Sequence, residues 1–159
     1  MSKESVRIFN VVANNAPSQG DLWEVWKQLS NQVARIKEET LEAEKSCQEQ
    51  NMAGLIDDMA DIWYTYTYLE QLLEAFGVDV KAVKSEVCRN NSQKYTKSYT
   101  YAAESKEVLE GSGVECYVDE TVFQGEIYYT VRRKGDLKIL KLRHHEAPSL
   151  AKYVPKEFL

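Results

Sequence analysis

Histidine and cysteine are scarce in this chain, and each scarcity excludes a class of metal site. The two histidines, His144 and His145, are adjacent, so the chain has no Glu-x-x-His pair of the kind that holds two iron ions in helical bundles. The three cysteines are far apart in the sequence and form no Cys-x-x-Cys pair. We therefore interpret them as reduced cytosolic thiols, neither a disulfide framework nor a zinc site.

Long apolar runs and a secretory signal are also missing. No run of about 18 or more apolar residues occurs, so we expect no membrane span. The first ten residues lack the apolar core and the small-residue cleavage site of a signal peptide. The net charge of −5 argues against a general nucleic-acid coat protein, and we do not expect nucleic acid as a partner. These absences predict a cytoplasmic protein, and a length of 159 residues fits one domain of ordinary size.

The hydrophobic pattern predicts a mainly helical chain. Apolar residues at spacings of three and four run from Leu22 to Cys47 and again from Leu55 to Phe76. Asp21 is the predicted N-cap of the first of these helices, and the polar stretch 48–54 lets the chain turn back. The other expected elements are a short helix at 4–13, a third long helix at 80–97, short β-rich runs at 114–118, 126–131 and 137–142, and a turn at 132–136.

These elements predict an all-α fold with a small β extension. We expect an antiparallel helix-hairpin bundle, completed by homo-oligomerisation, with a C-terminal β-hairpin and an extended tail. The composition changes after about residue 100, so we divide the chain into a helical part, residues 1–100, and an extension of the same domain, residues 101–159. The long helices leave wide apolar faces uncovered, and this is the reason to expect pairing of copies.

Acidic residues are clustered on the two hairpin helices, as Glu38-Glu39-x-x-Glu42 and Asp57-Asp58-x-x-Asp61. If the chain reverses near residue 50, Glu39 comes level with Asp61, and Glu42 with Asp58, about 12–17 Å below the tip. Each cluster alone is more simply interpreted as a solvated helix face. The match across the hairpin, and the lack of a basic residue close to the second cluster, favour a cation site because like charges brought together repel.

A site built from carboxylates alone favours a hard divalent ion, Mg²⁺ or Mn²⁺. Such an ion usually handles phosphate groups, whose oxygens complete its coordination. Phosphates also need donors from the protein, and the third predicted helix offers them. Asn91 and Lys94 are three residues apart and share a face, with Arg89 nearby. The alternative is a basic helix end that complements the helix dipole.

These motifs together resemble the signature of the MazG-like superfamily of all-α nucleoside triphosphate pyrophosphohydrolases. The family has Glu-x-x-Glu followed by Glu-x-x-Asp, and the two acidic clusters are similar to it. The run 86–94 resembles the family's later E-V-x-x-x-N-x-x-K element. The segment 131–141 is similar to the hairpin that ends many phage-type members. The resemblance covers most of residues 20–142 in order.

The resemblance implies roles for the residues that match the motif. The first residue of the family's Glu-x-x-Asp is Asp58 here, and some phage-type members place an aspartate at the position of Asp57, so either of them is the third ligand. Two or three Mg²⁺ ions per site are implied. The implied metal ligands are Glu39, Glu42, Asp61 and one of Asp57 and Asp58; Glu38 is a ligand or the base for water, and Asn91, Lys94 and Arg89 hold phosphates. Lys94 would also stabilise charge on the leaving pyrophosphate.

Recognition of the base has three candidates. Trp23 lies off the main apolar stripe, at a position similar to that of an aromatic residue in the base pocket of deoxycytidine-type members. Tyr64 follows the second acidic cluster, and Asn14 lies in the loop before the first long helix. Trp26 and Trp63 lie on the apolar stripes and are expected in the core.

The resemblance implies hydrolysis of (deoxy)nucleoside triphosphates between the α- and β-phosphates, for control of the nucleotide pool. An alternative within the family is a dGTP- or GTP-selective enzyme that supplies dGMP for modified-purine phage DNA, in the host cytoplasm. From another functional class, a non-catalytic helical dimerisation or binding module that keeps the family shape is one alternative. Nucleic-acid binding through the basic residues between Arg132 and Arg143 is another. Family members are homodimers or homotetramers, so the same is expected of this chain.

Overall fold

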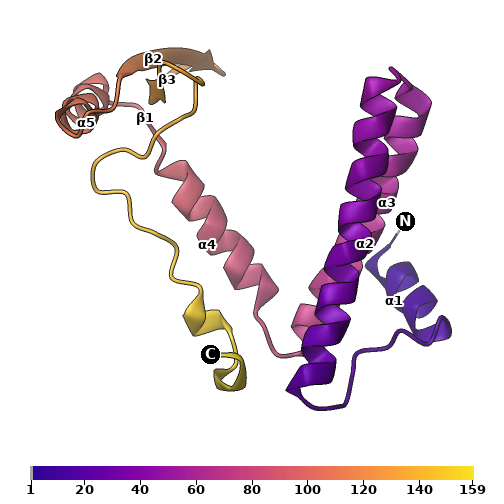
Figure 1. Ribbon diagram of the computed structural model, residues 1–159. Coiled ribbons are helices and arrows are strands. Elements are labelled where there is room, and N and C mark those ends of the chain that lie inside the picture. The colour runs from indigo at the N-terminus through magenta and orange to yellow at the C-terminus, as the bar shows by residue number, and fades with distance from the viewer. Residues whose placement is uncertain (1) are drawn as a thin grey trace. The chain divides into compact units, whose positions relative to one another are not determined.

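The computed structural model describes residues 2–159, and most of them are helical (Figure 1). Within these residues there are five α-helices, two short 3-10 helices and one three-stranded antiparallel sheet. The elements are α1 (Lys3–Val12), α2 (Leu22–Gln48), α3 (Met52–Ala75), α4 (Val80–Ser92), β1 (Tyr95–Thr96), α5 (Tyr99–Gly111), β2 (Cys116–Phe123), β3 (Glu126–Arg133), η1 (Ala151–Tyr153) and η2 (Lys156–Phe158). None of the helices in this range is long and apolar enough to cross a membrane.

The chain divides into two compact units. The first consists of the described residues up to Val80 together with Tyr153–Leu159, and the second consists of Lys81–Lys152. The first unit contains α1 and the hairpin of α2 and α3, and the second contains most of α4, then α5 and the sheet. The prediction of a mainly helical fold with a small antiparallel sheet near the C-terminus is therefore confirmed.

Local side-chain chemistry sets the ends of the hairpin helices. The side chain of Asp21 accepts the backbone N–H of Glu24 at 3.0 Å, which confirms the predicted N-cap of α2. The chain reverses at Gln50, whose φ is 55°, and α3 begins after the N-cap Asn51. A Cβ at Gly54 would lie 2.8 Å from Ser46 Oγ on α2, so a larger residue here would displace the Ser46 side chain where the two helices approach.

The core of the first unit lies where α1 joins the hairpin. It is formed by buried side chains from three helices, Val6, Val25, Leu29, Tyr68 and Leu72. In Figure 1, α2 and α3 lie side by side and α1 is close to them. The expectation that Trp26 and Trp63 are core residues is wrong for the single chain, in which they are 56% and 39% exposed. Their spacing in the sequence puts both residues on the apolar stripe of their helix. That stripe is wider than the surface that α1 and the other helix of the hairpin cover.

The second unit pairs the sheet with α5. The strand order is β1-β3-β2, with Tyr117 opposite Arg132 and Tyr95 opposite Thr130. Its core consists of Cys116, Val131 and Leu142, with Leu109 of α5 packed against them. Cys116 is a free thiol in this core, and burial raises its pKa.

Two expectations for this region are wrong. The third long helix ends at Ser92 instead of 97, because the Ser92 hydroxyl bonds back to the Arg89 carbonyl at 2.7 Å and Tyr95–Thr96 pair with β3. The run 137–142 forms only one bridge, Arg132 with Ile139, and is not a strand. Helix α5 was not predicted, although Ser98 is its N-cap and accepts the N–H of Tyr101.

Glu86 ties the C-terminal segment of the second unit to α4. Its carboxylate accepts from Arg89 Nη2 at 2.8 Å and from the backbone N–H of Ser149 at 3.3 Å. The hydrogen bond from Arg89 is the main reason that the pKa of Glu86 falls from 4.5 to about 2. Because the folded-state pKa is depressed, this carboxylate stabilises the unit above pH 4.5 and loses the contribution as the pH falls toward 2.

Acid is therefore expected to release the segment at Ser149. The protection factor of the Ser149 amide in hydrogen exchange should fall between about pH 4.5 and about pH 2, in step with protonation of Glu86. Glu86→Gln should lower this protection at neutral pH and remove most of its pH dependence. Glu115→Gln, at an exposed position of the same unit, serves as the control. Protection that stays constant in the wild type down to pH 2 would contradict the role of Glu86.

Candidate functional site

The hairpin brings the two acidic clusters to facing positions. Glu38, Glu39 and Glu42 lie on α2, and Asp57, Asp58 and Asp61 lie on α3. The reversal at Gln50 is the one that the spacing predicts. Glu39 and Asp61 line the same pocket, which confirms that these two residues come level with each other across the hairpin.

Burial and repulsion between the clustered carboxylates both raise the pKa of Glu39. Partial burial raises its pKa most, and the carboxylates of Asp61, Glu42, Glu38 and Asp58 raise it further, in that order. Asp61 acts most strongly of the four because it faces Glu39 across the hairpin. The anionic form of Glu39 is thus destabilised, and a bound cation would relieve this.

Asp57 and Asp58 differ in what they face. Asp58 is half-buried and accepts a hydrogen bond of 2.5 Å from Ser46 Oγ on α2, whereas Asp57 is exposed. Residues 57 and 58 leave a helix about 100° apart, so only one of them can face α2. In residues 2–159 no three His, Cys, Asp or Glu side chains lie close enough together to hold a metal ion by themselves. The donors nevertheless suit one chemically, because they are all carboxylate oxygens, which hard divalent ions prefer.

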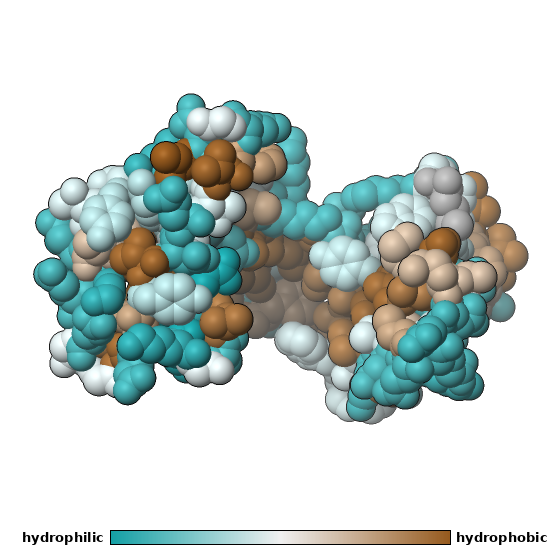
Figure 2. All heavy atoms as spheres, turned by 90° about the horizontal axis from the view of Figure 1, so that it is seen from above, coloured by the Kyte–Doolittle hydropathy of each residue, from teal (hydrophilic) through white to brown (hydrophobic). Residues whose placement is uncertain are grey.

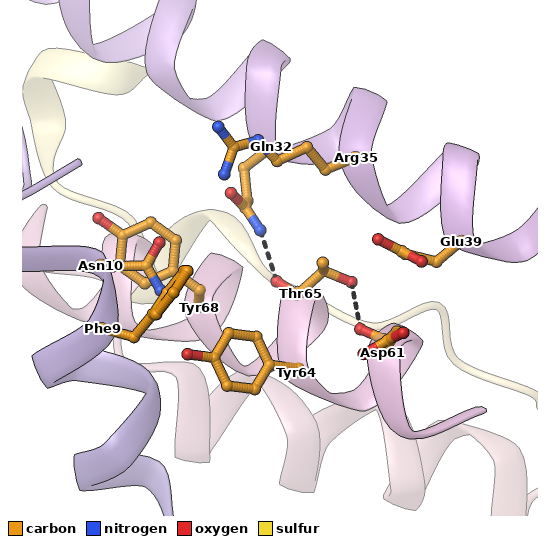
Figure 3. A pocket seen from close by; sticks show the side chains of 9 residues that line it. All are labelled: Phe9, Asn10, Gln32, Arg35, Glu39, Asp61, Tyr64, Thr65 and Tyr68. Carbon is orange, nitrogen blue, oxygen red and sulfur yellow. Dashed lines mark hydrogen bonds between the residues drawn. The ribbon is translucent and has the colours of Figure 1, made fainter. Parts of the chain in front are cut away.

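A pocket of about 290 Å³ opens beside Glu39 and Asp61 (Figure 3). It lies between α1, α2 and α3, and its lining changes in character along its length. The two carboxylates stand at one end, and aromatic and amide side chains form the other. The remaining lining residues are Phe9, Asn10, Gln32, Arg35, Tyr64, Thr65 and Tyr68.

Hydrogen bonds fix several of these side chains. Gln32, which is 4% exposed, donates from Nε2 to the Thr65 carbonyl at 2.8 Å, and the Thr65 hydroxyl donates to the Asp61 carbonyl at 2.9 Å (Figure 3). The Tyr68 hydroxyl donates to the carbonyl of Asn15. Burial raises the pKa of Tyr68, and the charge of Arg35 opposes this, so the guanidinium lies within electrostatic reach of the phenol.

The pocket includes residues that the sequence did not single out. Gln32 and Arg35 lie seven and four positions before Glu39. This spacing puts the three residues on one face of α2, so the sequence alone could have placed Gln32 and Arg35 beside Glu39. Phe9 and Asn10 had no such signal, because they reach the pocket only through the packing of α1 against α3.

The three candidates for base recognition are placed differently. Tyr64 lines the pocket, where its ring meets that of Phe9 edge to face at 5.7 Å between centroids. Trp23 lies outside it and lines a separate depression, with Lys27 Nζ 4.9 Å from the centre of its ring. Asn14 is exposed in the loop after α1 and has a φ of 56°. The roles of Trp23 and Asn14 in base recognition stay predictions.

The predicted phosphate-binding residues belong to the second unit. Lys94 Nζ donates to Asn91 Oδ1 at 2.8 Å, so these two side chains lie next to each other, as their spacing predicts. Arg89 is paired with Glu86 at 2.8 Å and with Glu146 at 3.8 Å. Their action on phosphates stays a prediction.

A comparison with known protein families supports the resemblance that the acidic clusters indicate. The sequence profile of the phosphoribosyl-ATP pyrophosphohydrolase family matches residues 14–91, which include both hairpin helices and nearly all of α4. No curated protein and no solved structure gives a match. The matched range also contains both acidic clusters and most of the residues that line the pocket. Over residues 14–91 the chain is therefore similar to the phosphoribosyl-ATP pyrophosphohydrolases, a family of the MazG-like superfamily of all-α nucleoside triphosphate pyrophosphohydrolases.

Proposed function

We propose that this protein hydrolyses (deoxy)nucleoside triphosphates between the α- and β-phosphates, giving a nucleoside monophosphate and pyrophosphate. The family match supports the coarser class, a hydrolase that acts on an acid anhydride of a nucleotide. The observation that carries the finer proposal is the pocket that joins Glu39 and Asp61 to an aromatic end of a size to receive a base. Control of the nucleotide pool in the cytoplasm is the role that we propose for the reaction.

Mg²⁺ is the proposed cofactor, with Mn²⁺ as a substitute and two or three ions per site. Glu39, Glu42, Asp58 and Asp61 would hold it, because the pKa of Glu39 is raised by burial and by the other three carboxylates, which repel its charge when no cation is bound. When bound, such ions lower the pKa of a water molecule and neutralise phosphate oxygens. The acidic hairpin cannot bind a triphosphate without this neutralisation, since both carry negative charge.

The protein's own groups would supply positioning and proton transfer. Glu38, exposed next to Glu39, is the proposed base that takes the proton of the attacking water. The water oxygen forms a bond to the α-phosphorus, and the bond from that phosphorus to the bridging oxygen breaks. Lys94, with Asn91 and Arg89, would bind the phosphates and stabilise the charge that develops on the pyrophosphate.

A panel of nucleotides tests the proposal. Pyrophosphate release should be measured with Mg²⁺ for the common ribo- and deoxyribonucleoside triphosphates and for phosphoribosyl-ATP. Release of pyrophosphate from a nucleoside triphosphate, abolished by a chelator and restored by Mg²⁺, is the expected result. If no nucleotide in the panel is hydrolysed, the enzyme proposal fails, and a non-catalytic binding module becomes the better interpretation of the fold.

Asp58 and Asp57 form a matched pair for the metal assignment. Asp58 faces α2 through its bond with Ser46, and Asp57 is exposed, so we propose Asp58 as the third ligand. Asp58→Asn is expected to raise the Mg²⁺ concentration needed for half-maximal activity by about tenfold or more. Asp57→Asn should change it less than about twofold. The reverse order in a Mg²⁺ titration would assign the ligand to Asp57.

We also propose that two or four copies associate through the hairpin. Several large apolar side chains are exposed on α2 and α3 of the single chain, among them Trp26, Val33, Ile56, Met59 and Trp63. Figure 2 shows apolar side chains, in brown, reaching the surface among hydrophilic ones. Exposed apolar groups in this number are usually covered by a partner. A single monomer mass in sedimentation or light scattering at micromolar concentration would reject the association.

A further inference from the structure

We propose that the open face of the three-stranded sheet in the second unit binds single-stranded RNA, with aromatic rings that stack on bases and cations that hold phosphates. The inference concerns residues within Lys81–Lys152 and uses none of the residues assigned to the proposed reaction, so it stands or falls separately. It adds a binding site and a class of macromolecule to the function of this protein.

The two units differ in the sign of their charge. Lys81–Lys152 contains 13 Lys and Arg against 10 Asp and Glu, a formal charge of +3, whereas the rest of the chain contains 7 against 15, a charge of −8. The net charge of −5 argues against nucleic acid only for the chain as a whole, because it conceals a basic unit. Such asymmetry between parts of one chain is typical where one part meets an anionic partner.

The sheet has one covered face and one open face. Among the described helices, α5 is the one that packs extensively on it, where Leu109 lies against Cys116 and Val131. Side chains alternate between the two faces along a strand, so the residues on either side of Val131 on β3 face away from α5. The face opposite α5 is therefore available to a partner.

Four aromatic side chains gather on this open face. Tyr128 of β3 lies there with Tyr95 of β1, and their rings meet edge to face at 5.7 Å between centroids. Tyr117 and Phe123 of β2 pair with even-numbered residues of β3, so they share the face of Tyr128. From Tyr117 to Phe123 the strand extends about 20 Å, the length of about six stacked nucleotides. Tyr95 and Phe123 are 47% and 60% exposed, so their rings are accessible to bases, which stack on aromatic side chains whatever the sequence.

Cations lie among these rings. Lys97 Nζ is 5.5 Å from the centre of the Tyr128 ring and 2.8 Å from Glu126 Oε2. Arg132 is on the same face, and its Nε donates to Asp119 Oδ2 at 2.6 Å. An ammonium has three donors and a guanidinium five, so each cation keeps donors for a phosphate after binding its carboxylate. The open face thus combines stacking surface with two phosphate-binding groups, as single strands require.

The two carboxylates on this face favour RNA over DNA. Asp119 and Glu126 hold their cations through Oδ2 and Oε2, and the second oxygen of each carboxylate can accept another hydrogen bond. The 2′-hydroxyl of ribose is a donor that deoxyribose lacks, so a strand seated on the rings gains these bonds only if it is RNA. A duplex is disfavoured, because its bases are stacked on one another and cannot reach the rings.

Fluorescence anisotropy of a labelled single-stranded RNA of about 12 nucleotides tests the inference. The whole protein is used in a chelator, so that no metal at the acidic hairpin attracts phosphates. We expect a Kd of about 1–100 μM at about 50 mM NaCl, weakened about five- to tenfold at about 200 mM by the loss of two phosphate contacts. DNA of the same sequence should bind at least about threefold more weakly, and an RNA duplex at least about fivefold.

Three results would overturn the assignment. They are no binding at about 500 μM protein, equal or tighter binding of the duplex, and equal binding of the DNA strand.

Tyr95→Leu tests the rings, with Tyr99→Leu as the matched control. Tyr99 is 60% exposed on α5, and its ring packs against Tyr129 on the covered side of the sheet. Tyr95→Leu should weaken RNA binding about 5- to 100-fold. Tyr95→Phe, which keeps the ring, and Tyr99→Leu should each change it less than about twofold. Unchanged binding in Tyr95→Leu, or equal losses in the two leucine variants, would reject the aromatic face as the site.

A charge variant keeps the test valid if Tyr95→Leu lowers the melting temperature. Lys97 is exposed, so Lys97→Gln is expected to fold normally. This variant should reduce the slope of log Kd against log salt concentration by about 0.7, the value for one phosphate contact in a single strand. An unchanged slope would show that Lys97 holds no phosphate and would overturn the proposed face.

Discussion

Glu39→Gln is expected to lower kcat/KM for the best nucleotide by at least about 100-fold, with little change in the fold. Glu39 lines the pocket and faces Asp61 across the hairpin, so it stands where metal and phosphates would meet. The amide keeps the shape of the side chain but removes the charge that a divalent ion requires. Losses of about two to three orders of magnitude are typical when a group that stabilises the charged transition state is removed.

The same substitution should stabilise the metal-free protein at neutral pH. Burial and the neighbouring carboxylates raise the pKa of Glu39 in the folded state. An acid with a raised folded-state pKa binds its proton more tightly in the native chain, so stability falls as the pH rises through that pKa. A glutamine at position 39 carries no negative charge, so the variant does not lose stability in this way. We therefore expect Glu39→Gln to melt at a higher temperature than the wild type in a chelator at pH 7, with a smaller difference near pH 4.

Glu44→Gln is the matched control, at an exposed position of the same helix. It should leave kcat/KM within about twofold and the melting temperature nearly unchanged. Measurements of pyrophosphate release and of melting with and without Mg²⁺ decide the prediction. Full activity of Glu39→Gln would remove the acidic hairpin from the reaction. Lost activity with a lower melting temperature in chelator would point to a structural role for Glu39.

Leu72→Ala is expected to destabilise the first unit by about 2–5 kcal/mol. Leu72 is completely buried and packs with Val6, Val25, Leu29 and Tyr68 where α1 meets the hairpin. Truncation leaves a cavity at this junction, and the long helices cannot easily shift to fill it. A change of this size is a large part of the stability of an ordinary domain, which is about 5–15 kcal/mol in total.

Tryptophan fluorescence in urea measures this effect for the first unit alone. All three tryptophans, Trp23, Trp26 and Trp63, lie in that unit. Leu41→Ala is the control, because Leu41 is on the same hairpin and 54% exposed, and it should change the unfolding free energy by less than about 0.5 kcal/mol. Equal effects of the two substitutions would show that the junction of α1 and the hairpin is not the core of the unit.

Leu72→Ala should also affect the pocket, because Tyr68 lies one turn away and lines both the core and the pocket. A rise in KM with kcat nearly unchanged is expected if the loosened core displaces Phe9 and Tyr64 from the base.

The helical hairpin and its acids followed from the sequence alone. Apolar spacing of three and four, the cap at Asp21 and the polar stretch before Met52 are local signals, and helix formation depends mainly on neighbours within about one turn. The placement of Glu39 level with Asp61 also depends only on the position of the reversal near residue 50 and on the rise per residue of a helix. The two-residue strand β1 and helix α5 were missed because tertiary pairing with β3 and the sheet decides them.

The sequence by itself therefore determined the helices of the first unit, the position of their reversal and the chemistry of the acidic clusters, since all three depend on short-range periodicity and residue type. Only the tertiary structure decided that Asp58 faces Ser46 while Asp57 is exposed, and that Phe9 and Asn10 of α1 complete the pocket. Residues about fifty positions apart, such as Asn10 and Asp61, line one pocket only because of how the apolar faces of the helices pack. Side-chain spacing along a single helix carries no information about that packing.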